Sequence, residues 1–381
     1  MNIAYVASAK IPSREANSIH VMKMCSAFAS EGHNVTLFVP MSTEIEPDIE
    51  DDFEYYGVPH NFNIKKVRLF LPFISIWKNN MHSFSVAMLI KKSKFDFVYG
   101  RDFYTCFVAA QVFRIPVLFE AHTPSVSTKF RSLIRSKRFL GLVVITEALK
   151  QIFVSQYNID EEKIYVAPDG ADELPDAVTP ARLIGKSVGM FNVGYIGQLY
   201  RGRGIELIGE IAERCPFAFF HIIGGFQEDI HMHKENLGYI RNINFYGYIP
   251  HSQTASYGVC MDVLVAPYQK EVYTTGVTKS SPSTVKWMSP LKVFEYMSFG
   301  KPIVCSDISV LREILENGIN CIMCPPEDVG AWCDAIKTLY ENQTFAKAIA
   351  KNASAGFIKY TWRQRARNIV QQLMEYRYGD K

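Results

Sequence analysis

Short apolar runs and amphipathic segments alternate along the whole chain. The runs are bounded by Gly, Pro, Asp or Asn, which is typical of buried strands, and the segments between them have the apolar spacing of helices. Strands are predicted at 2–7, 33–39, 95–99, 116–120, 141–145 and 163–167, and again at 192–196, 217–223, 242–246, 262–268, 302–306 and 320–324. Helices are predicted at 19–32, 104–113, 146–157 with Thr146 as its cap, from 204 to about 214, after 289, and at 360–378.

This order of elements predicts parallel sheets built from β-loop-α-β units, once in each half of the chain. The fold class is therefore α/β, with two Rossmann-like domains. A segment without periodicity, 173–187, carries Pro175 and Pro180 and is interpreted as the linker. We place the domains at 1–180 and 188–358. Ligands bind beyond the carboxyl ends of the strands in such sheets, and a cleft between the halves is the default site.

Composition bounds the class of protein. The chain has 381 residues, 48% of them hydrophobic, and a net charge of +3, so it is globular and too near neutral to argue for nucleic acid. No basic region precedes the first strand, so no signal peptide is expected. The longest apolar stretch, 69–77, is too short to span a bilayer. The scattered cysteines fit buried thiols in a reducing compartment, and Cys321 and Cys324 lack a second pair of zinc ligands. We expect a cytoplasmic protein.

Charge is uneven near the start of the chain. An acidic run at 44–54 is predicted to be a solvated loop. The segment between 60 and 101 contains many lysines and arginines but only one acid, Asp96, and its basic residues are interleaved with aromatic residues and methionines. A second basic and apolar patch lies at 129–138. Such segments either lie on an anionic membrane surface or form ordinary helices with the apolar face inward, and the sequence leaves both open. A peripheral position on the inner face of the membrane is therefore one expectation.

The segment 289–307 has the most unusual chemistry. Ser289 is a good N-cap, and Pro290 suits the first helical position. Lys292 and Glu295 lie three residues apart at the start of this helix. A helix start favours anions, and the lysine adds a full charge, so a ligand with a phosphate and sugar hydroxyls would satisfy both side chains. The alternative is an ordinary surface ion pair between them.

A second candidate site is the glycine-rich loop between the strand at 192–196 and the next helix. It carries Arg201 and Arg203 among its glycines, and backbone amides with guanidinium groups can hold a phosphate. It is not a dinucleotide fingerprint, because Leu207 stands where the third glycine is needed, and it is not a Walker A loop. The alternative is a basic loop without a ligand, but the paired arginines favour phosphate.

Three further stretches lie where ligands bind in such sheets. His122 follows the strand at 116–120. The loop 8–18 follows the first strand, and Asn17 or Ser18 is expected to cap the next helix, which is compatible with contact to a ligand. The loop 269–288 is rich in Ser and Thr and is long enough to be functional.

Taken together, these segments resemble the retaining GT-B glycosyltransferases of family 4. The matching segments, in the family's order, are ANSIHVMKMCSAFASEGH at 16–33, FEAH at 119–122, VAPDG at 166–170, VGYIGQLYRGRG at 193–204 and SPLKVFEYMSFGKPIVCSD at 289–307. The resemblance implies two Rossmann-like domains facing a central cleft. The acceptor would bind to 1–180 and the nucleotide-sugar to 188–358, and the C-terminal helix at 360–378 would cross back to the first domain.

The resemblance also implies roles for single residues. Arg203 and Lys292 would hold the diphosphate of the donor, and His122 would lie near the transferred sugar; these three are the expected catalytic residues. Glu295 would bind the ribose hydroxyls. The other donor-binding residues would be Ser289, Pro290, Leu291, Gly197, Arg201, Gly247 and Tyr248, the last two through backbone groups that read the base. The acceptor-side residues would be Arg14, Asn17 and Ser18.

Two positions depart from the family pattern. Trp287 stands where a second Glu often contacts the donor sugar, and Ala16 with Asn17 replaces the paired glycines of the first loop. No Asp-x-Asp motif ends a predicted strand, so we expect neither a metal nor another cofactor. The co-substrate would be a UDP- or GDP-sugar.

The expected reaction is front-face transfer with retention. Fixed positive groups would stabilise the leaving phosphate, which would itself take the proton of the acceptor. The expected acceptor is a glycan or a lipid-linked intermediate of a surface polysaccharide. Two other classes stay open, namely a nucleotide-sugar- or carbohydrate-binding protein without catalysis and a sugar-nucleotide epimerase.

Overall fold

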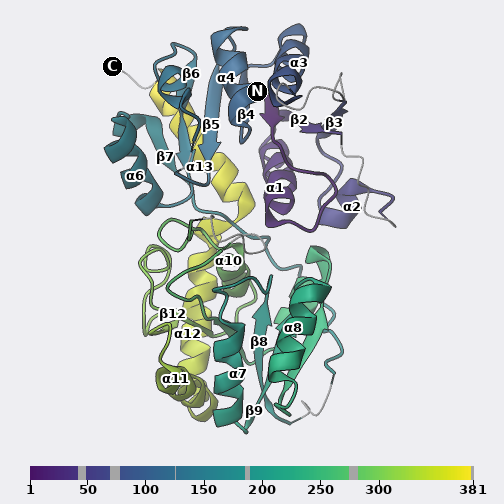
Figure 1. Ribbon diagram of the computed structural model, residues 1–381, viewed down its shortest axis with the longest axis vertical. Coiled ribbons are helices and arrows are strands. Elements are labelled where there is room, and N and C mark those ends of the chain that lie inside the picture. Colours follow the sequence, from purple (N-terminus) through teal and green to yellow (C-terminus); the bar gives the residue numbers. More distant parts are fainter. Residues whose placement is uncertain (42–48, 69–77, 125, 185–188, 274–281, 379–381) are drawn as a thin grey trace. The chain divides into compact units, whose positions relative to one another are not determined.

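The computed structural model describes residues 1–41, 49–68, 78–124, 126–184, 189–273 and 282–378. Its contacts divide the chain into two compact units, whose elements are labelled in Figure 1. The first unit comprises Met1–Asp169 and Trp362–Lys381, and the second comprises Gly170–Thr361. Residues 173–184 of the predicted linker therefore lie in the second unit.

The first unit is built on a sheet in which all neighbouring strands are parallel. The described strands lie in the order β3-β2-β1-β4-β5-β6-β7. They are β1 (Asn2–Val6), β2 (Asn34–Pro40), β3 (Asn63–Val67), β4 (Phe97–Gly100), β5 (Val117–Ala121), β6 (Phe139–Val144) and β7 (Ile164–Val166). The helices are α1 (Ala16–Ser30), α2 (Asp52–Tyr56), α3 (Lys78–Lys92), α4 (Phe103–Gln111), α5 (Phe130–Ile134), α6 (Glu147–Tyr157) and α13 (Trp362–Tyr378).

The second unit is built on a separate parallel sheet. Its described strands lie in the order β10-β9-β8-β11-β12-β13. They are β8 (Phe191–Ile196), β9 (Ala218–Ile223), β10 (Ile243–Gly247), β11 (Val263–Ala266), β12 (Ile303–Ser306) and β13 (Ile322–Cys324). The helices are α7 (Ile205–Arg214), α8 (Gln227–Leu237), α9 (Thr254–Gly258), α10 (Leu291–Ser298), α11 (Val329–Glu341) and α12 (Gln343–Phe357).

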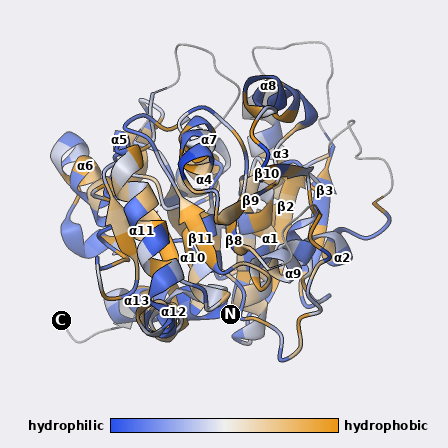
Figure 2. Ribbon diagram, turned by 90° about the horizontal axis from the view of Figure 1, so that it is seen from below, coloured by the Kyte–Doolittle hydropathy of each residue, from blue (hydrophilic) through white to orange (hydrophobic). Residues whose placement is uncertain are grey.

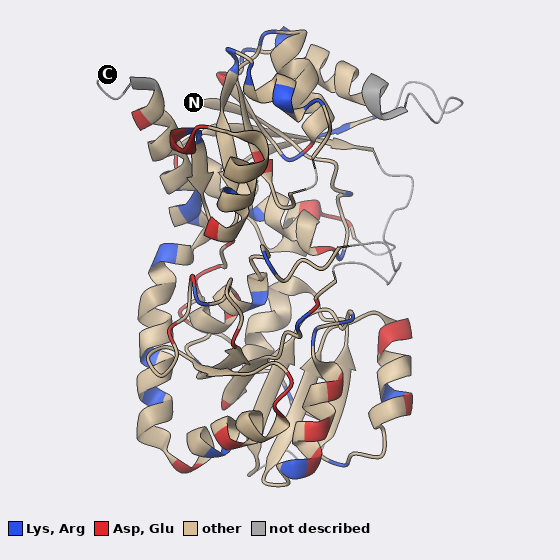
Figure 3. Ribbon diagram, turned by 60° about the vertical axis from the view of Figure 1, so that its left-hand side comes forward, with Lys and Arg blue, Asp and Glu red and all other residues tan. Residues whose placement is uncertain are grey.

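The inner strands of each sheet are buried along most of their length, and β5 and β9 are buried throughout. Strands covered on both faces need continuous apolar runs, which is why the sequence pattern located them. Figure 2 shows these strands mostly in hydrophobic colours, whereas helices such as α11 carry both colours. Charged residues are found mainly on the helices and loops of both units (Figure 3). Among the described residues, no helix is long and apolar enough to cross a membrane.

The last helix, α13, belongs to the first unit and packs against α1. Its predicted inward face is confirmed, since Trp362, Ala366 and Leu373 are buried. On its surface, Arg363 and Arg367 both pair with Glu31 at the end of α1. The helix thus returns the end of the chain to the edge of the first sheet, where β5 and β6 end.

Three local predictions need correction, and one is confirmed. Thr146 caps α6 as predicted, because its hydroxyl accepts the Leu149 N–H. In contrast, α10 begins one residue later than expected: Pro290, not Ser289, is its N-cap residue, and no side chain caps it. Likewise, α1 has Glu15 as its N-cap residue, so neither Asn17 nor Ser18 is the cap.

The third correction concerns the charged segments near the start of the chain. The acidic run predicted as a loop ends in helix α2, whose start is capped by Asp51. The basic segment between 60 and 101 contains strand β3 as well as helix α3. Its aromatic stretch at 69–77, like residues 42–48 of the acidic run, lies outside the described residues.

Candidate active site

The ammonium group of Lys292 lies inside the second unit rather than at its surface. Lys292 is the second residue of α10, and the whole residue is only 8% exposed. Its Nζ atom lies 3.6 Å from the centroid of the Tyr195 ring and 5.5 Å from that of Tyr268. Within the described part of the chain, Nζ has no hydrogen-bond partner. The alternative of an ordinary surface ion pair therefore does not describe this lysine.

The loop after β8 leaves the space that Lys292 fills. Gly197 has φ +145°, and a Cβ atom built on it would lie 2.8 Å from Lys292 Nζ. Any side chain at this position would displace the ammonium group, so the glycine and the lysine fit together. Burial of the ammonium group lowers the pKa of Lys292 well below its usual value, and the charge of Arg203 lowers it further.

Arg203 shares this space, and Arg201 does not. The guanidinium carbon of Arg203 lies 5.3 Å from the centroid of Tyr268, the ring that also faces Lys292. Its Nε atom is buried without a hydrogen-bond partner among the described residues. The exposed Arg201 instead lies over Tyr273, 5.4 Å from that ring. The structure therefore brings one of the two predicted arginines to Lys292.

Glu295 has a partner that the sequence did not reveal. Its Oε1 atom lies 2.6 Å from Nε2 of His251, a residue in the short 3-10 helix His251–Gln253. That helix follows the loop at Gly247 and Tyr248, which was predicted to read the base. Gly247 itself has φ +82°, a left-handed conformation that favours glycine. Ser289, Pro290 and Trp287 are buried around the start of α10, whereas Leu291 is half-buried.

In the first unit, Glu120 at the end of β5 collects contacts from several elements. Its Oε1 atom lies 2.6 Å from Nε2 of His122, 2.8 Å from Nη2 of Arg365 and 3.1 Å from Nε2 of His20. Its Oε2 atom accepts the hydroxyl of Tyr99 on β4. One carboxylate thus joins α1, β4, the end of β5 and α13.

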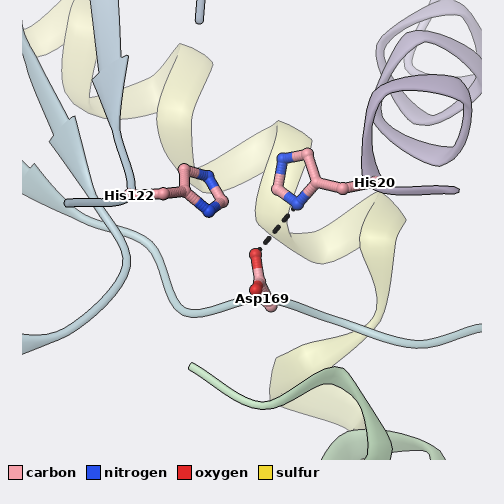
Figure 4. Close-up of side chains that lie close together, drawn as sticks. All are labelled: His20, His122 and Asp169. Atoms are coloured by element: carbon pink, nitrogen blue, oxygen red, sulfur yellow. Dashed lines mark ion pairs between the residues drawn. The ribbon is translucent and has the colours of Figure 1, made fainter. Parts of the chain in front are cut away.

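His20 is enclosed by carboxylates on two sides. Its other ring nitrogen, Nδ1, lies 2.9 Å from Oδ1 of Asp169, which follows β7 (Figure 4). The His20 ring also packs edge-on against those of His122 and Trp362, at centroid distances of 4.9 and 5.2 Å. Because α1, β5, β7 and α13 all contribute, no short sequence motif contains this cluster.

The pKa shifts in this cluster leave the two acids ionised and His122 neutral. Burial alone raises the pKa of Glu120, but Arg365 and His20 hold it well below its usual range. Asp169 behaves similarly: burial raises its pKa, but the contacts with His20 lower the pKa, and the net shift is a decrease. Burial lowers the pKa of His122 to about 4, and the charge of Arg101 contributes to the decrease. His122 is therefore neutral at pH 7, beside an ionised Glu120.

A cavity of about 520 Å³ opens beside this cluster. It is lined by His122, Asn17, Arg101 and Ser8 at the ends of strands and the start of α1. Ser18 is only 1% exposed, and its hydroxyl lies 2.8 Å from the carbonyl oxygen of Glu15. Asn17 and His122 thus meet at one cavity, whereas the Ser18 hydroxyl stabilises the turn that starts α1. Arg14, in the same loop, is half-buried.

One group of described side chains has the spacing of metal ligands. Atoms of His20, His122 and Asp169 lie within 4.8 Å of one another (Figure 4). However, both ring nitrogens of His20 are already in direct contact with carboxylates, and the guanidinium of Arg365 touches Glu120. A divalent cation would have to break these pairs and lie near a fixed positive charge. The chemistry of the donors therefore favours an ion-pair network.

Comparison with known families identifies the class of protein. Residues 18–173 match the family model described as Glycosyltransferase Family 4. Residues 191–342 match the model described as Glycosyl transferases group 1. The two matches cover most of both units, so the chain belongs to the group 1 glycosyltransferases and is a glycosyltransferase, as the sequence motifs predicted.

Individual relatives are distant. The chain is 22% identical to a D-inositol 3-phosphate glycosyltransferase of Corynebacterium urealyticum over 252 residues, which cover 60% of this chain and 55% of that protein. It is 21% identical over 388 residues to an uncharacterized glycosyltransferase of Methanocaldococcus jannaschii, with 93% of this chain and 92% of that protein covered.

Solved structures share the fold. Sucrose-phosphate synthase from Thermosynechococcus elongatus has a TM-score of 0.73 and 15% identity, with both chains covered completely (100%). Anabaena HepE in complex with UDP and glucose has a TM-score of 0.69 and 16% identity, with 97% of this chain and 98% of that chain covered. This likeness confirms the predicted GT-B fold class.

Proposed function

We propose that the protein transfers a sugar from a nucleoside-diphosphate donor, a UDP- or GDP-sugar, to a glycan or lipid-linked acceptor. The observation that carries the proposal is the placement of Lys292 and Arg203 around Tyr268, where neither Lys292 Nζ nor Arg203 Nε has a hydrogen-bond partner among the described residues. A buried ammonium group beside a half-buried guanidinium group is costly to maintain unless a ligand neutralises them. A diphosphate has the charge that they require. HepE, with a similar fold, has been crystallised with UDP, which supports this class of donor.

The remaining donor contacts follow from the geometry of the second unit. The amino end of α10 offers the N–H groups of Leu291 and Lys292 to the diphosphate. Glu295, in the next turn, would accept hydrogen bonds from the ribose hydroxyls through its carboxylate. The backbone at Gly247 and Tyr248 would contact the base. Arg201 would act only at the periphery, since it is exposed over Tyr273.

The acceptor and the transferred sugar would lie in the cavity of the first unit. His122, Asn17 and Arg101 supply an imidazole, an amide and a guanidinium there, which suit carbohydrate hydroxyls. Arg14 is a further acceptor-side candidate from the same loop as Asn17. Ser18 is assigned to the turn rather than to the ligand because its hydroxyl is buried and bonded.

The chemistry would proceed without a metal. Lys292, Arg203 and the amino end of α10 would stabilise the charge that develops on the leaving diphosphate. The acceptor hydroxyl would attack the anomeric carbon from the face of the leaving group as the C1–O bond breaks. Its proton would pass to the leaving phosphate oxygen, so the anomeric configuration is retained.

The exposed residues of helix α3 favour binding of the protein to a membrane surface, where a lipid-linked acceptor would reside. Phe84, Met88 and Leu89 are exposed on this helix, next to the exposed Lys91 and Lys92 at its end. Apolar side chains flanked by lysines suit the boundary between acyl chains and anionic headgroups. We therefore propose a cytoplasmic enzyme that binds peripherally to the inner face of the membrane.

Transfer is tested by incubating the protein with labelled UDP- and GDP-sugars and a mixture of glycan and polyprenyl-linked acceptors. The expected result is a labelled glycoside with the anomeric configuration of the donor. Binding without turnover would instead identify a carbohydrate- or nucleotide-binding protein, and an isomerised donor would identify an epimerase. A thermal-shift comparison of UDP, GDP and ADP on the same sample identifies the base, with UDP or GDP expected to give the largest stabilisation.

A further inference from the structure

A single oxygen of Glu120 contacts side chains from three separate segments of the chain. His122, Arg365 and His20 all lie within 3.1 Å of Oε1. Glu120 and Arg365 are both almost fully buried, at 2% and 3% exposure. A buried ion pair of this kind usually stabilises a protein no better than well-packed apolar side chains do. Its presence beside a cavity therefore calls for an explanation other than stability.

The ionised state of Glu120 determines which nitrogen of His122 carries the proton. A carboxylate only accepts hydrogen bonds, so Nε2 of His122, at 2.6 Å, has to be the donor. Because burial makes His122 neutral, with a pKa of about 4, the ring has one proton only. Nδ1 is then an acceptor, and His122 offers the cavity a lone pair rather than an N–H group.

Arg365 keeps Glu120 ionised. Its Nη2 atom contacts Glu120, and its Nε donates to the carbonyl oxygen of Pro168 at 2.9 Å. Nη2 also donates to the carbonyl oxygen of Ala167, so the guanidinium is fixed on several sides. Without this charge, burial would raise the pKa of Glu120. A protonated Glu120 would donate to Nε2 of His122 and move the ring proton to Nδ1, which would turn the acceptor into a donor.

We propose that Glu120 and Arg365 are positioning residues that hold His122 as one neutral tautomer, with Nδ1 available to accept a hydrogen bond from a carbohydrate hydroxyl. This inference rests on the proposed function, because it assumes that a sugar or acceptor occupies the cavity. His20 contacts the same carboxylate and is itself held by Asp169. The end of the chain thereby determines the hydrogen-bonding character of a residue at the end of β5.

The tautomer is measured directly from the ¹⁵N shifts of labelled histidine rings, with His122 assigned from a His122→Gln variant. The variants are Glu120→Gln, Arg365→Met and the double variant Glu120→Gln/Arg365→Met. The double variant removes both buried charges, so of the three variants it is the one that we expect to fold with near-normal stability. Arg367→Met is the matched control, since Arg367 also joins α13 to α1 but through the surface residue Glu31.

For the unmodified protein we expect a single tautomer with the proton on Nε2 at pH 7. The double variant should give a mixture of tautomers and a kcat lowered roughly ten- to a hundredfold, with the KM for the nucleotide-sugar within about twofold. Arg367→Met should change neither the tautomer nor kcat. A folded double variant with the Nε2–H tautomer and normal kcat would overturn the proposal, as would a wild-type His122 protonated on Nδ1.

These outcomes separate the inference from the proposed function. If the protein transfers no sugar at all, the ring shifts of the free protein still report whether Glu120 and Arg365 set the tautomer. A fixed tautomer without transfer would contradict the proposed function only. Transfer with an unaffected tautomer in every variant would contradict the inference only.

Discussion

The ammonium nitrogen of Lys292 lies 3.6 Å from the centroid of the Tyr195 ring, in a part of the second unit from which water is largely excluded. A cation over an aromatic face gains about 1 to 2 kcal/mol when it is desolvated, which is less than a charge-assisted bond to phosphate provides. Tyr195 therefore holds the charge in place without neutralising it. The lysine is ready for an anion at the amino end of α10, and several predictions of its behaviour can be tested.

Replacement of Lys292 by Met should lower turnover by roughly two or more powers of ten. Met keeps the apolar stem that packs on Tyr195 but removes the charge at the leaving diphosphate, so the folded structure should survive. Steady-state kinetics with a nucleotide-sugar measure the effect. Lys301→Met, just beyond the other end of α10, is the control and should keep the normal rate. A rate near wild type for Lys292→Met would remove this lysine from the catalytic residues.

Nucleotide binding should be accompanied by proton uptake. Burial lowers the pKa of free Lys292, and a bound diphosphate would raise it again by opposite charge. Between these two pKa values the complex binds more protons than the free protein, so affinity should fall as the pH rises through this window. Titration calorimetry of UDP in buffers with different ionisation enthalpies measures the uptake. Lys292→Met should show none, and equal enthalpies in all buffers for the wild type would contradict the prediction.

Gly197→Ala should weaken nucleotide binding about tenfold or more, because its Cβ would lie 2.8 Å from Lys292 Nζ and 2.9 Å from Cε. Gly189 offers a matched control. It has φ +80°, and a Cβ there would meet nothing within 4 Å, so Gly189→Ala adds backbone strain alone. We expect Gly189→Ala to lower the free energy of unfolding by about 1 kcal/mol and to bind UDP normally. Fluorescence or calorimetric titration of both variants with UDP measures the two affinities. Equal affinities of Gly197→Ala and Gly189→Ala for UDP would contradict the steric fit between Gly197 and Lys292.

The sequence predicted what is local and apolar. The inner strands are continuous hydrophobic runs, and each was located to within a few residues. Strand β3 was missed because it is the edge of its sheet, where Lys65 and Lys66 face solvent and no apolar run is needed. The start of α10 was misplaced by one residue, since Ser289 is a preferred cap but the chain places Pro290 there.

The donor-side candidates come from local sequence signals, whereas the contacts around Glu120 do not. Arg203 lies in the glycine-marked loop after β8, Lys292 lies in the first turn of α10 after Pro290, and both face the same ring. In contrast, the contacts that surround Glu120 come from His20 and Arg365, which are 100 and 245 residues away along the chain. The one available signal was a polar side chain at 20 on an otherwise apolar helix face. No spacing rule connects it to an arginine in the last helix.

Membrane attachment is tested on the exposed apolar side chains of α3. The double variant Met88→Glu/Leu89→Glu should lose co-sedimentation with vesicles that contain anionic lipid. The apolar side chains that would insert into the membrane are then replaced by carboxylates, which anionic headgroups repel. Met232→Glu replaces a methionine on α8 of the second unit that is at least as exposed as Met88; it is the control and should sediment as the wild type does. Sedimentation that is independent of anionic lipid, or that is lost equally in the control, would contradict a docking role for α3.

The protein should keep full transferase activity in excess EDTA. Under the proposed function, Arg203, Lys292 and the start of α10 would supply three positive groups where a divalent cation could otherwise stabilise the leaving diphosphate, and they would need no metal to do so. In the one described group with metal-ligand spacing, His20, His122 and Asp169, the His20 ring already contacts Asp169, and His122 already contacts Glu120. Assays with EDTA and with added Mg²⁺, Mn²⁺ or Zn²⁺ measure the dependence, with His20→Gln as the variant that removes a ligand. Restoration of an EDTA-inactivated enzyme by one of these ions, abolished in His20→Gln, would show that the cluster is a metal centre and not an ion-pair network.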